Sequence, residues 1–131
     1  MVQAKGSPQQ KEQLSAILAN AALPLLQKGD FVPAADLSRQ CVKTADPKGK
    51  VAGSCQLIFG LAAFQSAAAM DAETEKTKSC DMAKKEDALV AEADTALNVA
   101  KATRPDAVEK PLAAVPQFKA RTASMMKSYC K

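Results

Sequence analysis

Residues 51–70, VAGSCQLIFGLAAFQSAAAM, contain no charged side chain over 20 consecutive positions. A helix of that length can span a membrane, but six alanines, two serines and two glutamines are interspersed among the more apolar residues. The strongly apolar residues are Val51, Leu57, Ile58, Phe59, Leu61, Phe64 and Met70. This mixture is more typical of a buried helix than of a membrane span. We therefore expect residues 51–70 to form the central helix of the fold, and we expect no membrane span.

The composition of the chain predicts an all-α fold. Of its 131 residues, 47% are hydrophobic, 27 are alanine, none is tryptophan, and phenylalanine and tyrosine together number five. Alanine has the highest helix propensity but buries little area, so the core should be thin and the helices close together. Strand-forming residues nowhere alternate with polar ones over a useful length. No long linker divides the sequence, and residues 1–131 are predicted to form a single domain.

Boundary signals place two helices before the central segment. Ser7 is a candidate N-cap, and Pro8 suits the first helical position. Gly29 suits the residue that ends this first helix, because glycine tolerates a left-handed backbone. Asp30 is expected to cap a second helix over residues 31–43.

Charged residues follow the central segment. Residues 71–78 either continue the central helix or form a short helix of their own. Ser79 or Asp81 is expected to cap another helix that runs to about Thr103.

Two prolines interrupt the helical pattern in the C-terminal part of the chain. Pro111 and Pro116 each remove a backbone donor, so residues 106–116 are expected to be irregular or to form short turns. A last helix is then predicted over residues 117–130.

Cysteine is the most informative residue type. The chain contains Cys41, Cys55, Cys80 and Cys130, an even number in a small protein, which is typical of a disulfide framework in an oxidising compartment. No C-x₂₋₄-C pair is present, so a zinc site and a thioredoxin-like centre both lack their motif. Free buried thiols or a metal site are the alternatives. The cysteines predict structural disulfides, no metal, and a periplasmic or extracellular location.

Four cysteines allow three connectivities, of which we expect Cys41–Cys55 and Cys80–Cys130. Residues 44–50, TADPKGK, form a polar turn, so the end of one helix and the start of the next should lie at similar height. The second disulfide would tie the last helix to the start of the preceding long one. The predicted fold is a disulfide-stapled helical bundle, or a short array of α-hairpins, of about five helices.

Charge is distributed unevenly along the chain. Residues 71–94 contain eight acids and four lysines, a net charge of −4, whereas residues 110–131 contain five bases and no acid, a net charge of +5. This pattern predicts that the basic end lies against the acidic helix; contact with a polyanion or an anionic lipid is the alternative. A basic stripe with aromatic residues or a recognition motif is lacking, so no nucleic-acid partner is expected.

The sequence offers little for catalysis. It contains no histidine, which removes the commonest general base. Its glycines form neither a phosphate-binding loop nor a dinucleotide fingerprint. Glu86, Asp87, Glu92 and Asp94 resemble candidate glycosidase carboxylates, but lysines are interleaved with them and the whole set is interpreted as a solvated helix face. We expect no catalytic residues, no cofactor and no enzymatic activity.

The first two predicted helices carry a repeat-like pattern. Apolar residues recur at helical spacing from Leu18 to Leu25, Gly29-Asp30-Phe31 forms a turn followed by an aromatic residue, and Ala34 provides a small residue in the next helix. In these features, residues 14–80 resemble tetratricopeptide-repeat-like helical hairpins. Ser38 stands where that family usually has an aromatic residue, and Pro24 is foreign to its first helix.

The resemblance implies a concave face that binds peptides or protein helices, lined by Leu23, Leu26, Leu57, Leu61 and Phe64. The last helix, with Phe118, Met125 and Tyr129, is expected to cover this face; an exogenous peptide helix is the alternative. The sequence thus predicts a noncatalytic exported binding or scaffold protein that recognises a peptide or protein partner. A carrier of a small apolar ligand or lipid, with a cavity between its helices, is the alternative function. An enzyme that uses only carboxylates and lysines is the third and least favoured hypothesis.

Overall fold

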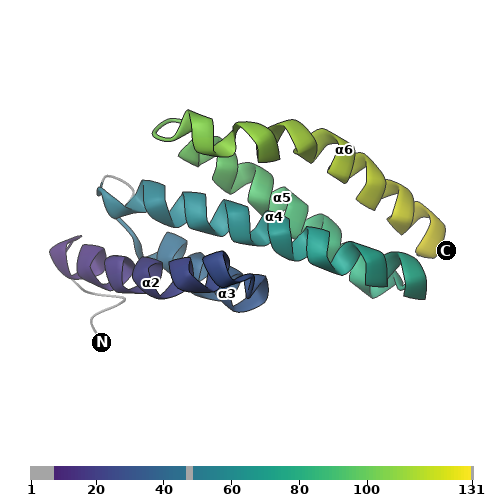
Figure 1. Ribbon diagram of the computed structural model, residues 1–131, viewed down its shortest axis with the longest axis horizontal. Coiled ribbons are helices and arrows are strands. Elements are labelled where there is room, and N and C mark those ends of the chain that lie inside the picture. Colours follow the sequence, from purple (N-terminus) through teal and green to yellow (C-terminus); the bar gives the residue numbers. More distant parts are fainter. Residues whose placement is uncertain (1–7, 47–48, 131) are drawn as a thin grey trace.

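The computed structural model describes residues 8–46 and 49–130, which contain five α-helices and no strand (Figure 1). The helices are α2 (Pro8–Lys28), α3 (Phe31–Thr44), α4 (Val51–Thr77), α5 (Cys80–Ala100) and α6 (Pro105–Tyr129). The all-α prediction is confirmed. The expected N-cap Ser7 lies outside the described residues, although α2 does begin at Pro8.

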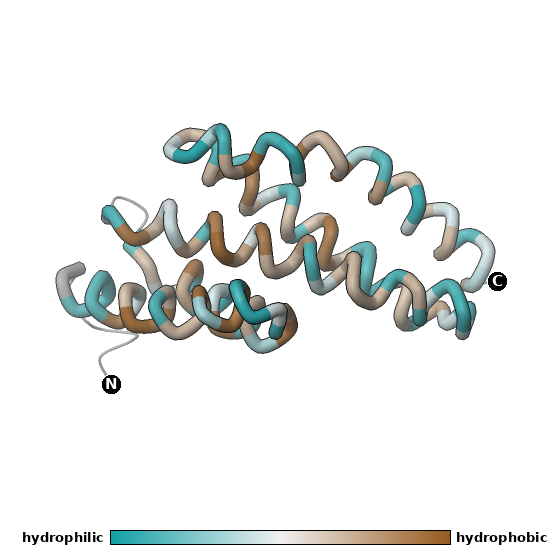
Figure 2. The backbone as a smooth tube through the Cα atoms, viewed as in Figure 1, coloured by the Kyte–Doolittle hydropathy of each residue, from teal (hydrophilic) through white to brown (hydrophobic). Residues whose placement is uncertain are grey.

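The helices form three layers around α4. α2 and α3 make a hairpin on one side, α4 and α5 run through the middle, and α6 lies on the opposite side (Figure 1). α4 contacts each of the other four helices, as expected for the uncharged segment. By length and composition α4 is also the one described helix apolar enough to cross a membrane. Along α4, hydrophobic positions concentrate in the first half of the helix (Figure 2).

Both predicted disulfides are present. Cys41–Cys55 joins the end of α3 to the start of α4, with 5.5 Å between the Cα atoms. Cys80–Cys130 joins the start of α5 to the residue after α6, with 4.9 Å between the Cα atoms. The short polar connection after α3 brings the first pair together, as the sequence predicts. The fold is therefore a disulfide-stapled helical bundle.

Helix ends follow local signals, with two exceptions. Gly29 has a φ of +92°, and α4 continues through the charged segment to Thr77, where Lys78 adopts a left-handed backbone. The Ser79 Oγ accepts a hydrogen bond of 3.2 Å from the Met82 N–H, so Ser79 caps α5. Asp30 occupies the N-cap position of α3, as predicted, but its side chain makes no capping hydrogen bond and its carboxylate pairs with Lys28 at 3.5 Å.

α5 also ends earlier than predicted. Its last residue is Ala100, and residues 101–103 form a turn instead of extending the helix to Thr103. The Thr103 hydroxyl donates to the Ala100 carbonyl at 3.3 Å, which gives that helix end a local hydrogen-bond partner.

The prediction that residues 106–116 are irregular is wrong, because α6 runs unbroken through Pro111 and Pro116. A proline inside a helix removes one hydrogen bond and costs roughly 3 kcal/mol. Packing outweighs this cost here. Val108, Val115 and Thr122, at seven-residue spacing, are buried along one face of α6. The helix predicted for residues 117–130 is therefore only the second half of α6.

The alanine-rich core allows very close helix approach at Gly60. Gly60 on α4 is buried, and a Cβ atom added to it would lie 2.8 Å from the Cγ and Cδ2 atoms of fully buried Leu97 on α5. Real Cβ atoms essentially never show so short a contact. Glycine is therefore required at this crossing of α4 and α5.

We expect Gly60→Ala to destabilise the protein by about 1–3 kcal/mol through overpacking. In an unconstrained helix the same change would stabilise by roughly 0.5–1 kcal/mol. Gly53→Ala is the matched control on α4, because its Cβ would meet only the exposed Thr103 side chain, at 3.1 Å. Urea denaturation of both variants checks this prediction. Equal midpoints for the two variants would show that α4 and α5 separate without penalty.

Candidate binding groove

The five predicted groove residues do not share one open surface. Leu23 on α2 is 40% exposed, and Leu57 on α4 is half-buried. Leu26 packs on the small cluster of Ala34, Ala35 and Ala62. Leu61 and Phe64 pack against the core formed by α4, α5 and α6. Leu23 and Leu57 line one open pocket together, and the other three do not line it.

α6 covers the Phe64 end of the predicted face. The Phe64 and Phe118 rings lie edge to face, with centroids 5.6 Å apart and planes at 85°. Met125 is buried, whereas Tyr129 is half-buried and lines a separate cleft beside Glu75. Covering by the last helix is confirmed for Phe64, and it does not extend to Leu23.

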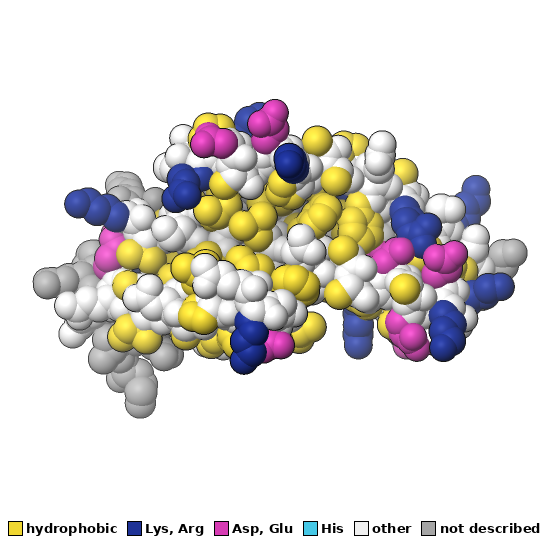
Figure 3. All heavy atoms as spheres, viewed as in Figure 1, with side chains coloured by type: hydrophobic (Ala, Val, Ile, Leu, Met, Phe, Trp, Pro, Cys, Tyr) yellow, Lys and Arg dark blue, Asp and Glu magenta, His cyan; other side chains and the backbone are white. Residues whose placement is uncertain are grey.

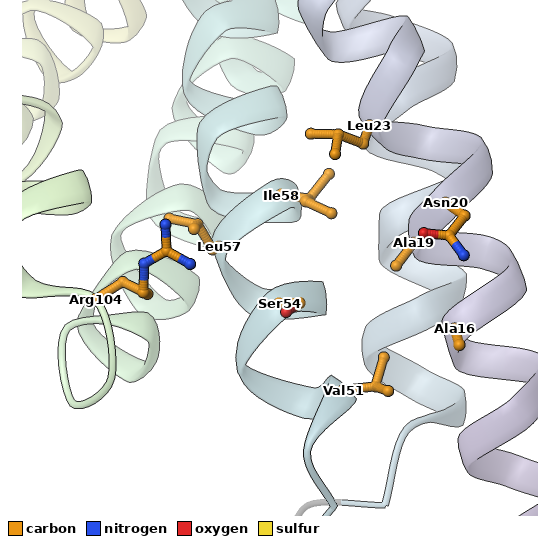
Figure 4. A pocket seen from close by; sticks show the side chains of 9 residues that line it. All are labelled: Ala16, Ala19, Asn20, Leu23, Val51, Ser54, Leu57, Ile58 and Arg104. Carbon is orange, nitrogen blue, oxygen red and sulfur yellow. The ribbon is translucent and has the colours of Figure 1, made fainter.

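The remaining open part is a pocket of about 340 Å³ between α2 and α4. α2 provides one wall, α4 provides the other, and the loop between α5 and α6 provides one arginine. The lining residues are Ala16, Ala19, Asn20, Leu23, Val51, Ser54, Leu57, Ile58 and Arg104. Leu23 and Ile58 point toward one another, and the Arg104 guanidinium lies near Leu57 (Figure 4). We call this pocket the α2–α4 groove.

Apolar side chains are concentrated on this face of the molecule. In the space-filling view they form a band along its middle, between the α2–α3 hairpin and α6 (Figure 3). Among the described residues, Ile17, Leu23, Val32 and Val99 are the large hydrophobic side chains with the highest exposure. Leu23 is the one of these four that lines the α2–α4 groove.

Most of the groove residues were not predicted from the sequence. Ala16, Asn20 and Leu23 lie at intervals of four and three residues, so they share one helix face, and this spacing was an available signal. Ile58 adjoins the predicted Leu57. Arg104 could not be found in this way, because only the tertiary structure brings the loop after α5 to the groove.

The acidic and basic segments meet, as predicted. Lys119 on α6 pairs with Asp94 on α5 at 2.8 Å, and Arg121 pairs with both Asp71 and Glu75 on α4 at 2.8 Å. The Arg121 guanidinium lowers the pKa of Asp71 by donating hydrogen bonds to its carboxylate. These contacts hold the second half of α6 on the α4–α5 pair.

The interpretation of the α5 acids as a solvated face is wrong for Glu86. Its side chain is fully buried, and neither carboxylate oxygen makes a hydrogen bond of standard geometry with the described residues. Burial raises its pKa to about 7, and nearby Asp71 adds to the shift. Ala83, Val90, Ala93 and Leu97 are buried on the same face at helical spacing. Glu86 lies three residues after Ala83 and four before Val90, so this spacing indicates that its side chain faces the core.

Glu86 is unsuited to contact a substrate, because both of its oxygens are sealed from solvent. Within residues 8–46 and 49–130, no group of three His, Cys, Asp or Glu side chains is arranged to hold a metal ion. The α2–α4 groove, with its apolar walls and its single arginine, remains the candidate site.

Comparisons with protein-family models, with curated proteins and with solved structures found no match to this chain. The likeness to tetratricopeptide-repeat-like hairpins therefore stays a prediction.

Proposed function

We propose that this protein is a noncatalytic exported binding or scaffold protein that recognises a peptide or protein partner through the α2–α4 groove. The observation that carries the proposal is the open apolar pocket in which Leu23 of α2 faces Ile58 of α4. Apolar side chains left on the surface between two helices favour an aliphatic anchor from a partner, as in helix-in-groove recognition.

The shape of the groove favours a peptide over a lipid. Its volume of about 340 Å³ is near the lower end of ligand pockets, which span roughly 300–1,000 Å³. A small-molecule pocket buries most of its ligand, whereas this groove is open to solvent along one side. A partner that covers the groove with its own surface fits this shape better than an enclosed lipid chain.

Two further features support an exported, noncatalytic protein. Both disulfides are intramolecular, and such bonds persist in the periplasm or outside the cell and are rare in reducing cytosol. Glu86, the carboxyl group whose pKa is raised to about 7, lies where no substrate can reach it. The disulfides and the buried Glu86 are both compatible with a groove that binds a partner and catalyses no reaction.

The test begins with a phage-displayed library of random peptides selected on the oxidised protein. We expect enriched peptides to lose roughly 10-fold or more in affinity for Leu23→Ser, because anchor contacts typically contribute more than 1 kcal/mol. Val99→Ser is the matched control, since Val99 is 50% exposed and lies outside the groove. Dissociation constants from fluorescence anisotropy check the prediction. If no peptide is enriched, or if Leu23→Ser and Val99→Ser bind equally well, the proposed function is wrong.

A further inference from the structure

Arg104 differs from the other arginines of the chain in having no carboxylate partner within residues 8–46 and 49–130. The sequence contains three arginines. Arg39 pairs with Glu92 and Asp36, and Arg121 pairs with Asp71 and Glu75. Among the described residues, the Arg104 side chain has no hydrogen bond or ion pair.

The acids closest to Arg104 in sequence line a different surface. Asp106 and Glu109 border a cleft of about 540 Å³ at the start of α6, together with Lys101. Of the described residues that line the α2–α4 groove, Arg104 alone is charged. The groove therefore carries one uncompensated positive charge beside apolar walls.

This combination defines the chemistry of a ligand. A guanidinium presents its N–H donors as a planar fork that matches a carboxylate with two parallel hydrogen bonds. Arginine is also more weakly hydrated than lysine, so it suits a partly desolvated interface. On the groove walls, the Asn20 amide and the Ser54 hydroxyl supply further hydrogen-bonding groups.

We infer that the partner is a peptide segment that places an acidic side chain on Arg104 and adjacent aliphatic side chains between Leu23 and Ile58. The α2 wall from Ala16 to Leu23 is about 10 Å long, two helical turns. A partner helix can therefore present two aliphatic anchors one turn apart, with the acid near the α5–α6 loop. This inference rests on the proposed function and names the partner chemistry of the same groove.

The test compares peptide selections on the wild type and on Arg104→Gln, using a library of random 12-residue peptides displayed without a free C-terminus. We expect the wild-type pool to combine Asp or Glu with neighbouring Leu, Ile or Val. The Arg104→Gln pool should keep the aliphatic residues and lose the acid. A synthetic peptide from the wild-type pool should bind Arg104→Gln roughly 10- to 100-fold more weakly. Replacing the acid in that peptide by its amide should cause a similar loss.

Lys101→Gln is the matched control, because it removes one positive charge from the same loop but lines the other cleft. Far-UV circular dichroism verifies that each variant is folded. An acid content that is equal in both pools, or equal weakening by Lys101→Gln, would overturn the inference. So would binding carried by the free C-terminal carboxylate of the synthetic peptide. Peptides that respond to Leu23→Ser but not to Arg104→Gln would leave the proposed function intact and refute this inference alone.

Discussion

Reducing both disulfides is expected to unfold most of the protein at 25 °C. In the chain-entropy model, the 14-residue separation of Cys41 and Cys55 corresponds to about 3 kcal/mol, and the 50-residue separation of Cys80 and Cys130 to about 4 kcal/mol. The loss is large against a total stability that is typically about 5–15 kcal/mol. The core offers little reserve, because most of its buried hydrophobic residues are alanines.

Thermal denaturation with and without reductant measures this effect, and alkylation confirms that the four thiols are free. Paired alanine variants separate the two contributions: Cys41→Ala/Cys55→Ala and Cys80→Ala/Cys130→Ala. The Cys80→Ala/Cys130→Ala variant should lose more stability through chain entropy, because the disulfide that it lacks closes the longer loop. A melting temperature unchanged by full reduction would mean that helix packing alone holds the bundle.

Three features of the sequence explain why the central helix, the first disulfide and the position of α6 could be predicted. The run from Val51 has no charged face to present to solvent, so its helix is expected to be covered on several sides, and α4 contacts all four other described helices. The turn TADPKGK is too short to let Cys41 and Cys55 lie far apart. The opposite charges of two long segments likewise predict that α6 lies against the acidic residues of α4 and α5.

α6 shows where local signals fail. Pro111 and Pro116 each oppose a helix, and intrinsic propensity alone predicts a break. Val108 and Val115 nevertheless pack into two separate core clusters, and a continuous helix is required to reach both. Burial of that stripe depends on α4 and α5, which lie far away in sequence. Tertiary packing therefore overrides the proline signal.

The candidate site likewise contains residues that the sequence predicts and residues whose places only the tertiary structure shows. The resemblance to tetratricopeptide-repeat-like hairpins predicts Leu23 and Leu57 on one face, and the structure brings them to one pocket. Phe64 was assigned to the same face, but Phe118 of α6 covers it. Arg104 reaches the groove only because the α5–α6 loop folds back toward α4. No spacing within the sequence encodes that approach.

Glu86 is expected to make the protein less stable at pH 8 than at pH 5. Its pKa is raised from an ordinary 4.5 to about 7 in the folded protein, first by burial and then by Asp71. Between these pH values the folded state binds more protons than the unfolded state, so stability falls as the pH rises. This difference in pKa corresponds to on the order of 3 kcal/mol of stability, which is lost progressively from about pH 4.5 to about pH 7.

The charged groups around Glu86 shape the rest of the pH profile. Asp71 and Arg121 face it from α4 and α6, and Thr74 of α4 is an uncharged neighbour that favours its ionised form. The lowered pKa of Asp71 contributes stability above its ordinary value of 3.8, and this contribution is lost as the pH falls further. Taken by themselves, these two groups contribute most to stability between about pH 4 and pH 5, above the ordinary pKa of Asp71 and near that of Glu86.

Glu86→Gln tests this assignment, because the amide has nearly the same shape and cannot ionise. We expect the variant to show little change in stability between pH 5 and pH 8, and to exceed the wild type at pH 8. Burying the amide without hydrogen bonds will offset part of that gain.

Glu73→Gln, at an exposed position on α4, is the matched control and should keep the wild-type pH dependence. Urea denaturation at the two pH values supplies the free energies of unfolding, and carbon NMR of the Glu86 carboxyl group follows its titration directly. If wild type and Glu86→Gln lose equal stability between pH 5 and pH 8, another group controls the pH response and Glu86 is ionised without penalty in the folded protein.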